Sequence, residues 1–226
     1  MAAATRAKAK AASKSGFCFG RTKAAKATIK PSRTYFTTRL HNSRASNIFN
    51  IYIIDKKNTK TKKINLIKEI IEIPSNKTIE HELEVVLLIG KEGVPKNREE
   101  AHTFISGFSI GLDLTDRHLQ TELKKKGMPW FASKTFKGSA VIDANFIHEC
   151  PQEFYLKVNQ KIRQEGNLKD MIFSFEDIIL HLSKTVGFKK GDIIFTGTPE
   201  GVGALESGDQ IEMGFNNYPP KKLVVI

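Results

Sequence analysis

Two glutamates at the start of an apolar run are the first residues that could do chemistry. Glu82 and Glu84 lie one residue apart in the stretch EHELEVVLLIG, residues 80–90. In a β-strand, residues two apart project from the same face, with Cα atoms roughly 6.5–7 Å apart. The residues that follow are apolar at every position up to Ile89, which indicates a strand covered on both faces. Two unpaired carboxylates beside such a strand would be costly to bury.

A divalent cation held between the carboxylates would remove this cost. Carboxylate oxygens are hard ligands, which favours Mg²⁺ or Mn²⁺ over zinc. Asp113 is a candidate third ligand, because it stands between two leucines in the strand-like run FSIGLDLT, residues 108–115. Nearby Asp116 is expected in a loop. The alternative for the two glutamates is an edge strand with one solvated face.

Three further polar residues follow the carboxylates. Arg117 comes four residues after Asp113, and Gln120 follows at helical spacing. A guanidinium group can hold a carboxylate through two parallel hydrogen bonds, so Arg117 is a candidate clamp for an anionic substrate, with an ordinary surface charge as the alternative. Lys134 lies in the turn-rich run KGMPWFASKTFKG, residues 126–138, whose composition alone predicts a surface lysine.

The elements that must position these residues are mostly strands. Short apolar runs bounded by Gly, Pro, Asn and Asp dominate residues 64–226, and they are rich in β-branched residues. A short helix is predicted near residues 98–104 and a longer one at residues 174–187, where Ser174 and Asp177 match a capping box. The apolar stripe of the longer helix comprises Ile178, Ile179, Leu182 and Val186.

The positive charge of the chain belongs to its N-terminal part. The net charge is +12, but residues 1–63 hold 16 Lys or Arg and one acidic residue, so residues 64–226 hold 20 basic and 23 acidic residues. Residues 1–54 contain no acidic residue and are rich in Ala, Ser, Thr, Lys and Arg, a composition typical of an organelle transit peptide. We expect residues 1–63 to be a transit peptide with a low-complexity linker, and residues 64–226 to be the catalytic domain.

The charge distribution also bears on partners. A basic arm that binds nucleic acid or another protein is the alternative to a transit peptide. Because the basic excess does not extend into the body, we expect no nucleic-acid partner, and because no apolar run approaches ~20 residues, we expect no membrane span. Cys18 and Cys150 have neither metal-site nor disulfide-framework spacing, which fits a reducing compartment.

Four motifs in order resemble the fumarylacetoacetate hydrolase family. They are HELEVVLLIGK, GLDLTDRHLQTELKKKGMPWFASKTFKGSAVI, KVNQKIRQEG and GDIIFTGTPEGVG, within residues 79–226. The resemblance is to the mitochondrial acylpyruvate hydrolase and oxaloacetate decarboxylase branch. It implies an α+β fold, mainly β with few helices, arranged as a mixed β-sandwich or roll, usually as a homodimer with one divalent ion per site. The implied location is mitochondrial, with the cytoplasm or a plastid as alternatives.

The resemblance also assigns roles to the residues named above. It implies Glu82, Glu84 and Asp113 as ligands of Mg²⁺ or Mn²⁺, and Lys134 as a catalytic lysine beside the ion. It implies substrate contacts at Arg117, Gln120 and Thr198, the last within TGTP. The implied substrates are 2-keto acids: acylpyruvates cleaved by C–C hydrolysis, and oxaloacetate decarboxylated. In both reactions the metal ion and the lysine stabilise the enolate of pyruvate.

The N-terminal part departs from the family pattern. Residues 17–35 resemble the outline of a family strand and the segment after it, with Lys30 at a substrate-binding lysine position. Lys26 and Ile29 stand where the family has the histidine and glutamate of its catalytic base. Three outcomes stay open: an enzyme that retains only metal-driven decarboxylation, a metal-binding pseudoenzyme, or an N-terminus wrongly joined to a correct body.

Overall fold

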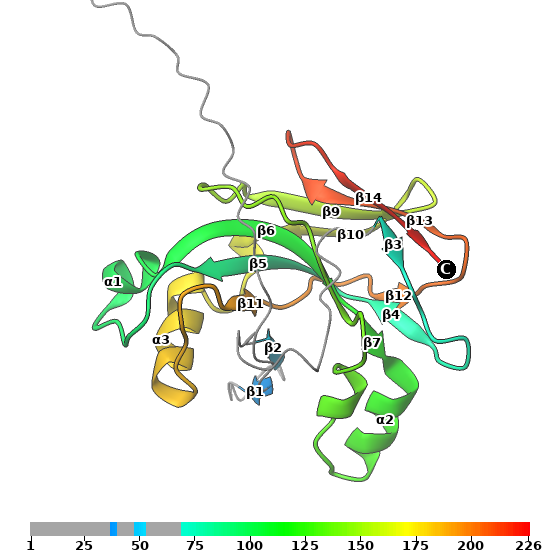
Figure 1. Ribbon diagram of the computed structural model, residues 1–226, viewed down its shortest axis with the longest axis horizontal. Coiled ribbons are helices and arrows are strands. Elements are labelled where there is room, and N and C mark those ends of the chain that lie inside the picture. Colours follow the sequence, from blue (N-terminus) through cyan, green and yellow to red (C-terminus); the bar gives the residue numbers. More distant parts are fainter. Residues whose placement is uncertain (1–36, 40–47, 53–68) are drawn as a thin grey trace, which may run out of the picture.

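The computed structural model of the chain describes residues 37–39, 48–52 and 69–226. Within these residues the fold is mainly β, with three α-helices and two short 3-10 helices (Figure 1). This confirms the predicted fold class. The predictions made for residues 1–35, including Lys30 and Cys18, lie outside the described residues.

The largest sheet has six strands in the order β1-β2-β11-β5-β6-β8, each antiparallel to its neighbours. The strands are β1 Thr37–Arg39, β2 Ile48–Tyr52, β11 Ile193–Phe195, β5 Leu83–Ile89, β6 Ile105–Asp113 and β8 Ala140–Ile142. The pairing of β2 with β11 joins the basic N-terminal segment to the body. The domain boundary at residues 63 and 64 therefore stays a prediction.

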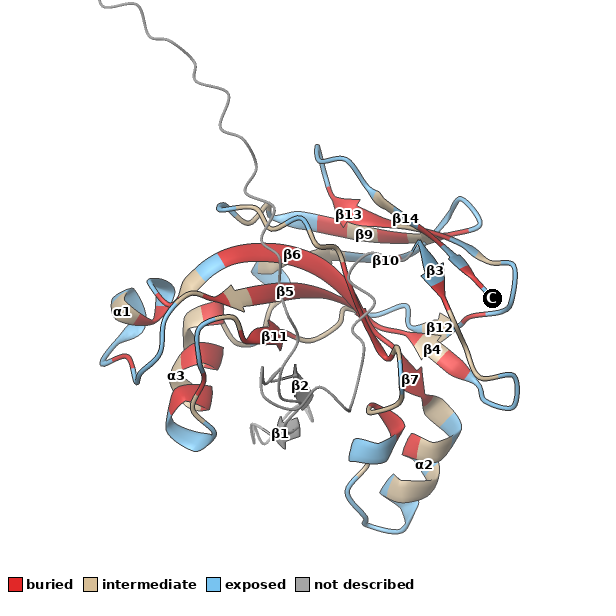
Figure 2. Cartoon of the chain, in the orientation of Figure 1, coloured by how far each residue is buried: buried red, intermediate tan, exposed pale blue. Residues whose placement is uncertain are grey.

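Strand β5 is covered on both faces, as its unbroken apolar run predicts. Val85 and Leu87 belong to the main core cluster, whereas Val86 packs in a second cluster with Phe195 and Ile142. Figure 2 shows β5 as buried along most of its length. This double coverage buries the strand along almost its whole length. The backbone next to the two glutamates is therefore held rigidly by packing on both sides.

A five-stranded sheet lies against the first, in the order β10-β9-β13-β14-β3 (Figure 1). Its strands are β10 Lys161–Asn167, β9 Glu153–Val158, β13 Gln210–Phe215, β14 Lys221–Val225 and β3 Ile70–Ile71. Its pairs are antiparallel except for β14 with β3, which makes the sheet mixed. Leu156 and Met213 from this sheet join Leu87 and Ile110 of the larger sheet in one core.

The edge strand β10 contains a bulge that turns one polar side chain inward. Its pairing with β9 shifts register between Ile162 and Gln164. Bulges of this kind locally re-aim side chains. Gln164 is consequently buried, whereas Arg163 and Glu165 on either side of it are exposed.

A third, small sheet contains Glu80, which lies two residues before Glu82. It has the order β12-β4-β7, formed by Gly203–Ala204, Ile79–His81 and Thr115–Asp116. Helix α2, Arg117–Lys125, begins directly after β7. The expectation that Asp116 is a loop residue is wrong: it is buried, caps α2 by accepting the Leu119 N–H at 3.1 Å, and pairs with Lys77 at 2.9 Å.

Helices α1, Arg98–His102, and α3, Phe175–Thr185, lie together at the end of the larger sheet (Figure 1). The predicted capping box of α3 is confirmed, because Ser174 and Asp177 bond each other's backbone N–H. Asp177 also accepts two hydrogen bonds from Arg98, at 2.6 and 2.7 Å, which ties the helices together. Of the predicted apolar stripe, Val186 is exposed because the helix ends before it.

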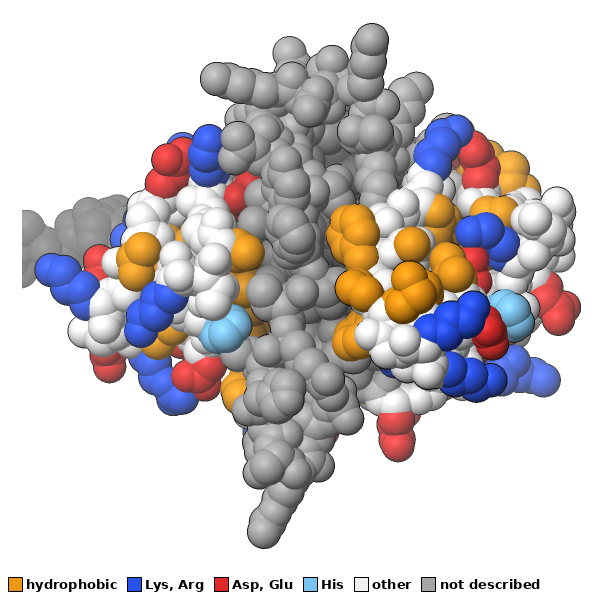
Figure 3. Space-filling model, turned by 90° about the horizontal axis from the view of Figure 1, so that it is seen from below, with side chains coloured by type: hydrophobic (Ala, Val, Ile, Leu, Met, Phe, Trp, Pro, Cys, Tyr) orange, Lys and Arg blue, Asp and Glu red, His pale blue; other side chains and the backbone are white. Residues whose placement is uncertain are grey.

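The surface of the described part mixes charges of both signs. On the face seen in Figure 3, Lys and Arg side chains lie among Asp and Glu side chains, and several hydrophobic side chains form a group. Among the described residues no helix is both long and apolar enough to cross a membrane.

Candidate active site

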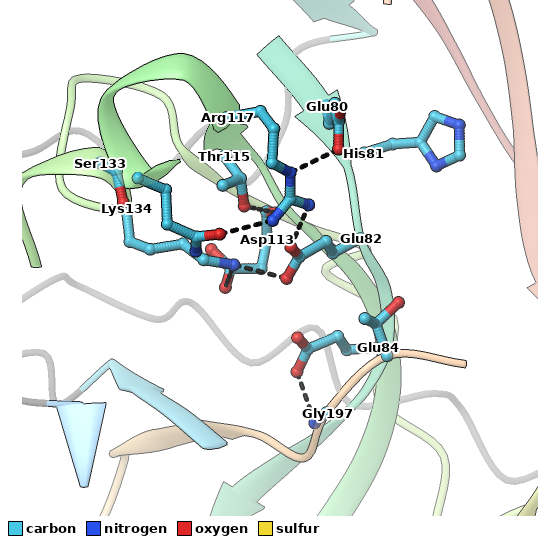
Figure 4. Close-up of polar contacts among 12 residues, drawn as sticks. Glu80, His81, Glu82, Glu84, Asp113, Thr115, Arg117, Ser133, Lys134 and Gly197 are labelled. Carbon is cyan, nitrogen blue, oxygen red and sulfur yellow. Dashed lines mark hydrogen bonds and ion pairs between the residues drawn. The ribbon is translucent and has the colours of Figure 1, made fainter. Parts of the chain in front are cut away.

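The pairing of β5 with β6 brings three carboxylates together. Backbone pairing sets Leu83 opposite Leu112, and the Asp113 N–H donates to the Glu82 carbonyl at 2.9 Å. Glu84 in β5, Glu82 directly before β5 and Asp113 at the end of β6 therefore meet, and each offers a carboxylate oxygen within 4.8 Å of the others (Figure 4). All three are buried. The spacing of Glu82 and Glu84 predicts that these two converge, and Asp113, a candidate because of its apolar neighbours, joins them.

Lys134 is buried against the carboxylates. Its Nζ donates to Asp113 Oδ2 at 2.7 Å and also to Glu82 Oε2 (Figure 4). Composition alone predicts a surface lysine, and that prediction is wrong. The turn-rich run instead folds into the 3-10 helix η1, Phe131–Ser133, and the Ser139 hydroxyl donates to the Lys134 carbonyl at 2.8 Å, so the loop carries the lysine inward.

Burial and neighbouring charges shift the pKa values of Glu84, Glu82 and Lys134 in different ways. Burial, the nearby Asp113 charge and the Glu82 charge hold the pKa of Glu84 well above its ordinary value. Burial would also raise the pKa of Glu82, but the charges of Lys134 and Arg117 hold it below its usual value. Burial would lower the pKa of Lys134, but the three surrounding carboxylates raise it. Lys134 therefore stays an ammonium, and Glu84 is the carboxylate with the least favourable surroundings.

This donor set fits a divalent cation. Counted as ionised, Glu80 and the three clustered carboxylates carry four negative charges against the two positive charges of Lys134 and Arg117, so two negative charges are in excess. All candidate ligand atoms are oxygens, which Mg²⁺ and Mn²⁺ prefer. The second oxygen of Glu84 is fixed by the Gly197 N–H at 2.7 Å, which limits the rotation of this carboxylate. The assignment of these residues as metal ligands is a proposal that rests on this fit.

Arg117 and Gln120 lie beside the carboxylates on the first turns of α2. The Arg117 guanidinium donates to Glu80 at 2.5 Å, to Glu82 at 2.7 Å and to Gln120 at 2.6 Å (Figure 4). Arg117 thus bonds Glu82 Oε1, whereas Lys134 bonds the other oxygen, Oε2. In this arrangement Arg117 orients protein carboxylates, and a substrate anion would compete with them for the guanidinium.

The loop after β11 supplies the other wall. Thr196 bonds the Val85 carbonyl at 2.9 Å, and the next residue donates its N–H to Glu84. Thr198 follows, partly exposed, and its Oγ1 accepts a hydrogen bond from Gln164 Nε2 at 2.8 Å. The glycine-rich motif TGTPEGVG therefore touches the carboxylate cluster through its backbone.

A cavity of about 610 Å³ opens in front of these groups. Arg117, Gln120, Lys134, Glu82 and Thr198 all line it, so the structure gathers five predicted site residues at one cavity. Lys30 lies outside the described residues. The remaining wall comes from the end of β10 and the segment after it, including Glu165, Asp170, Met171, Ile172 and Phe173.

Sequence reasoning missed two residues that hold the site together. Glu80 forms an ion pair with Arg117. Gln164, at the bulge in β10, bonds Thr198 in the loop between β11 and β12, residues 196–202, which we call the threonine loop. Gln164 lies in the motif KVNQKIRQEG, which the family resemblance contains but which received no role. The sequence shows only a glutamine between two charged residues, Arg163 and Glu165, and nothing in it marks this glutamine as buried.

The fold and the site together define a class of protein: a mixed β-sandwich that presents a buried carboxylate–lysine cluster to a cavity. The chain belongs to the fumarylacetoacetate hydrolase family. Residues 53–224 match the family described as fumarylacetoacetate (FAA) hydrolase C-terminal. This match agrees with the resemblance carried by the four sequence motifs.

Curated relatives carry names of enzymes. The chain is 39% identical over 145 residues to the oxaloacetate tautomerase FAHD1, mitochondrial, of Rattus norvegicus, which covers 62% of this chain and 66% of the rat protein. It is 36% identical over 160 residues to oxaloacetate tautomerase YcgM of Escherichia coli, covering 67% of this chain and 73% of that protein. The chain thus spans just under two thirds of the length of the rat relative.

Solved structures share the fold. A fumarylacetoacetate hydrolase family protein from yeast, ynq8, is 32% identical, with a TM-score of 0.63 over 69% of this chain and 70% of that chain. A fumarylpyruvate hydrolase from Pseudomonas aeruginosa, solved in complex with Mn²⁺ and pyruvate, has a TM-score of 0.66 over 87% of this chain and 96% of that chain. At 24% identity, the second likeness shows the fold alone.

Proposed function

We propose that this protein is a divalent-metal-dependent enzyme of 2-keto acids, acting on acylpyruvates, on oxaloacetate or on both. The observation that carries the proposal is the convergence of Glu82, Glu84 and Asp113 around Lys134, in a cluster whose Glu82 and Lys134 line the cavity. Family membership and the names of the relatives support the substrate class.

The charge of each candidate site residue determines its proposed role. The three carboxylates would hold Mg²⁺ or Mn²⁺, and the ion, when bound, would polarise the keto group of the substrate. Lys134 contributes a second positive charge that a developing enolate oxygen would meet. Thr198 and Gln120 face the same cavity, where they can orient the substrate carboxylate by hydrogen bonds.

Two reactions of one enolate are candidates. Hydrolysis or decarboxylation breaks a C–C bond next to the enolate, whereas keto–enol tautomerisation only moves a proton. Hydrolysis needs a base to activate water, and the family's histidine–glutamate pair has no match in residues 26–29. The names of the rat and Escherichia coli relatives favour tautomerisation of oxaloacetate as the second candidate function.

The test is an assay of the full chain with three readouts. Purified protein is incubated with Mg²⁺ or Mn²⁺ and with acetylpyruvate or oxaloacetate, while pyruvate release, CO₂ release and loss of the enol absorbance are followed separately. We expect at least one signal to exceed the rate with metal ion alone. Enol loss without pyruvate release assigns tautomerisation, and pyruvate release assigns hydrolysis or decarboxylation.

One outcome would favour a different function. If the folded protein binds Mg²⁺ but accelerates none of the three reactions, the metal-binding pseudoenzyme becomes the better description. A protein whose melting temperature is unchanged by Mg²⁺ and Mn²⁺ would contradict the metal site itself. A basic arm that binds nucleic acid would require that residues 1–63 remain on the mature protein, which mass spectrometry of the protein from cells would decide.

Two further properties belong to this proposal. We expect the protein to form a homodimer, which light scattering coupled to size-exclusion chromatography would test. We expect a mitochondrial location, because of the composition of residues 1–54 and the name of the rat relative. A fluorescent fusion of the full chain would test it.

A further inference from the structure

Gln164 connects two segments of the candidate active site through one side-chain amide. Its Oε1 accepts the Leu83 N–H at 3.0 Å and lies 2.7 Å from His81 Nδ1. Its Nε2 donates to Thr198 Oγ1 at 2.8 Å and to the Pro199 carbonyl at 3.1 Å. The amide thereby uses both of its lone pairs and both of its hydrogens. Gln164 is 1% exposed, so water does not compete for these bonds.

The partners fix which end of the amide is which. The Leu83 N–H can only donate, and the Pro199 carbonyl can only accept. The oxygen of Gln164 must therefore face Leu83, and its nitrogen must face Pro199. It follows that His81 carries a hydrogen on Nδ1, and that Gln164 is the donor in its bond to Thr198.

These contacts flank the residues that carry the proposed chemistry. His81 and Leu83 are the two chain neighbours of Glu82, and the ring of His81 points away from the carboxylates (Figure 4). On the other side, Thr198 follows Gly197, whose N–H holds Glu84. One buried amide thus links the backbone around one candidate metal ligand to the loop that fixes another.

We propose that Gln164 is a positioning residue that sets Thr198 as a hydrogen-bond donor towards the cavity and holds its loop in register with Glu82. This inference rests on the proposed function, because it takes Thr198 as a contact of the substrate carboxylate. The hydroxyl hydrogen of Thr198 has the Pro199 carbonyl at 3.4 Å, which is long for a hydroxyl donor. With Gln164 occupying a lone pair of the hydroxyl, its hydrogen is available to an anion.

The backbone gives independent support for a fixed distance between the loop and β10. Gly201, in the same loop, has a φ of +94°, and a Cβ there would lie 2.1 Å from the Arg163 carbonyl oxygen. Only glycine allows this close approach. Arg163 is the residue at the bulge that turns Gln164 inward, so the bulge contacts the loop through both backbone and side chain.

The experiment separates the two ends of the amide. Gln164→Glu keeps an acceptor for Leu83 and His81 but removes the donor to Thr198, whereas Gln164→Met removes both. Each variant is titrated with Mg²⁺ alone, and then with oxalate at saturating Mg²⁺, by calorimetry. Oxalate is the probe because it needs no turnover to report on anion binding. Gln210→Glu, an exposed position on β13, controls for an added charge elsewhere.

We expect Gln164→Glu to weaken oxalate binding about 10- to 100-fold, the loss of a hydrogen bond to a charged group, while the Mg²⁺ affinity changes less than about twofold. Gln164→Met should weaken the binding of both oxalate and Mg²⁺. Thr198→Val should match Gln164→Glu, and the double variant Gln164→Glu/Thr198→Val should be no weaker than either single variant. Gln210→Glu should bind oxalate like the wild type.

A second double variant removes the effect of charge. Gln164→Glu/Glu165→Gln keeps the net charge of the cavity wall, because Glu165 also lines the cavity. Compared with Glu165→Gln alone, we expect it to show the same 10- to 100-fold loss. Equal oxalate affinities of these two variants would mean that charge alone acts, and the proposal would be wrong.

Other outcomes also overturn the inference. Additive losses in Gln164→Glu and Thr198→Val would show two independent effects. A parallel loss of Mg²⁺ affinity in Gln164→Glu would show a merely structural role. A wild type that binds Mg²⁺ but no oxalate would remove Thr198 as an anion contact. A wild type that binds oxalate yet turns over no 2-keto acid would contradict the proposed function only, and the binding series would still decide the role of Gln164.

Discussion

At the residue scale, Glu84 is the most informative position in the carboxylate cluster. Burial and the charge of Asp113 raise its pKa well above the ordinary value, so this carboxylate gains most from a bound cation. We expect Glu84→Gln to lose the stabilisation that Mg²⁺ confers on the wild type, about 2.7 kcal/mol at a concentration 100 times Kd. Without metal, the variant should be at least as stable as the wild type, because a buried charge next to Asp113 is gone.

Melting curves with and without Mg²⁺ measure this difference. Glu206→Gln is the matched control, since Glu206 is exposed in the turn before β13 and should leave the Mg²⁺ effect unchanged. A Glu84→Gln variant that still gains stability from Mg²⁺ would exclude Glu84 as a ligand. A loss of the effect in Glu206→Gln as well would point to nonspecific charge screening.

The carboxylates could be predicted from sequence, whereas the lysine could be assigned only by resemblance. Glu84 and Asp113 stand in strands and Glu82 directly precedes one, so the period of two and the apolar neighbours indicate which side chains share a face. Lys134 stands in a loop without periodicity, and its burial depends on the Ser139 bond and on ion pairs with residues 21 and 52 positions away. No local pattern encodes such distant contacts.

At the element scale, the contact between β10 and the threonine loop makes a direct prediction. Gly201 and Gly127 both have positive φ, +94° and +64°, but a Cβ at Gly127 would meet nothing within 4 Å. We expect Gly127→Ala to lower the free energy of unfolding by about 1 kcal/mol, the cost of the backbone conformation alone. Gly201→Ala should cost about 1–3 kcal/mol more, because a Cβ would overlap the Arg163 carbonyl.

Urea denaturation of the two variants measures the difference. Equal costs would contradict the close packing of the loop on the bulge. In Gly201→Ala the oxalate affinity should also fall, since the loop that carries Thr198 must move away from Gln164. Unchanged oxalate binding would show that the loop position does not matter for the site.

Among the elements, α3 could be predicted closely and β10 could not. The start of α3 follows from a local signal, Ser174 with Asp177 three residues on, which needs no tertiary contact. The burial of Gln164 follows from an extra residue in the pairing with β9, which interrupts the alternation of the strand. A period of two read from the sequence cannot reveal where such a shift occurs.

At the scale of the whole molecule, the pairing of β2 with β11 tests the predicted domain boundary. A shortened chain that begins at residue 37 keeps β1 and β2, whereas one that begins at residue 64 bares the edge of β11. We expect the shorter chain to lose about 1–3 kcal/mol of unfolding free energy from its unpaired backbone groups, and to aggregate more readily. Urea denaturation and size-exclusion chromatography measure both effects, and equal behaviour of the two chains would support the boundary at residues 63 and 64.

Partial burial against the core predicts the reactivity of one thiol, that of Cys150. Burial raises the pKa of Cys150 to about 12 from an ordinary value of 9.0. At pH 8 roughly one molecule in ten thousand would carry the reactive thiolate, so we expect a disulfide reagent to label native Cys150 slowly and the urea-unfolded chain far faster. Because folding raises this pKa, the stability it contributes is present below pH 9.0 and is lost as the pH rises towards 12.

The Cys18→Ser variant makes Cys150 the single reporter, since the chain has two cysteines. Rapid labelling of the native variant at pH 8 would mean that the segment around Cys150 opens readily. A labelling rate that follows the unfolded fraction across a urea titration would instead confirm that the thiol reports on the core.

The position of Lys134 has a consequence for how the protein is made and loaded. By bonding Glu82 and Asp113, this ammonium gives the carboxylate cluster a counter-ion from within the protein. Sites built wholly from mutually repelling ligands need their metal in order to fold. With Lys134 as an internal counter-ion, we expect the fold not to depend on the proposed ion, so that the ion could bind after synthesis and exchange with the metal ions of the compartment.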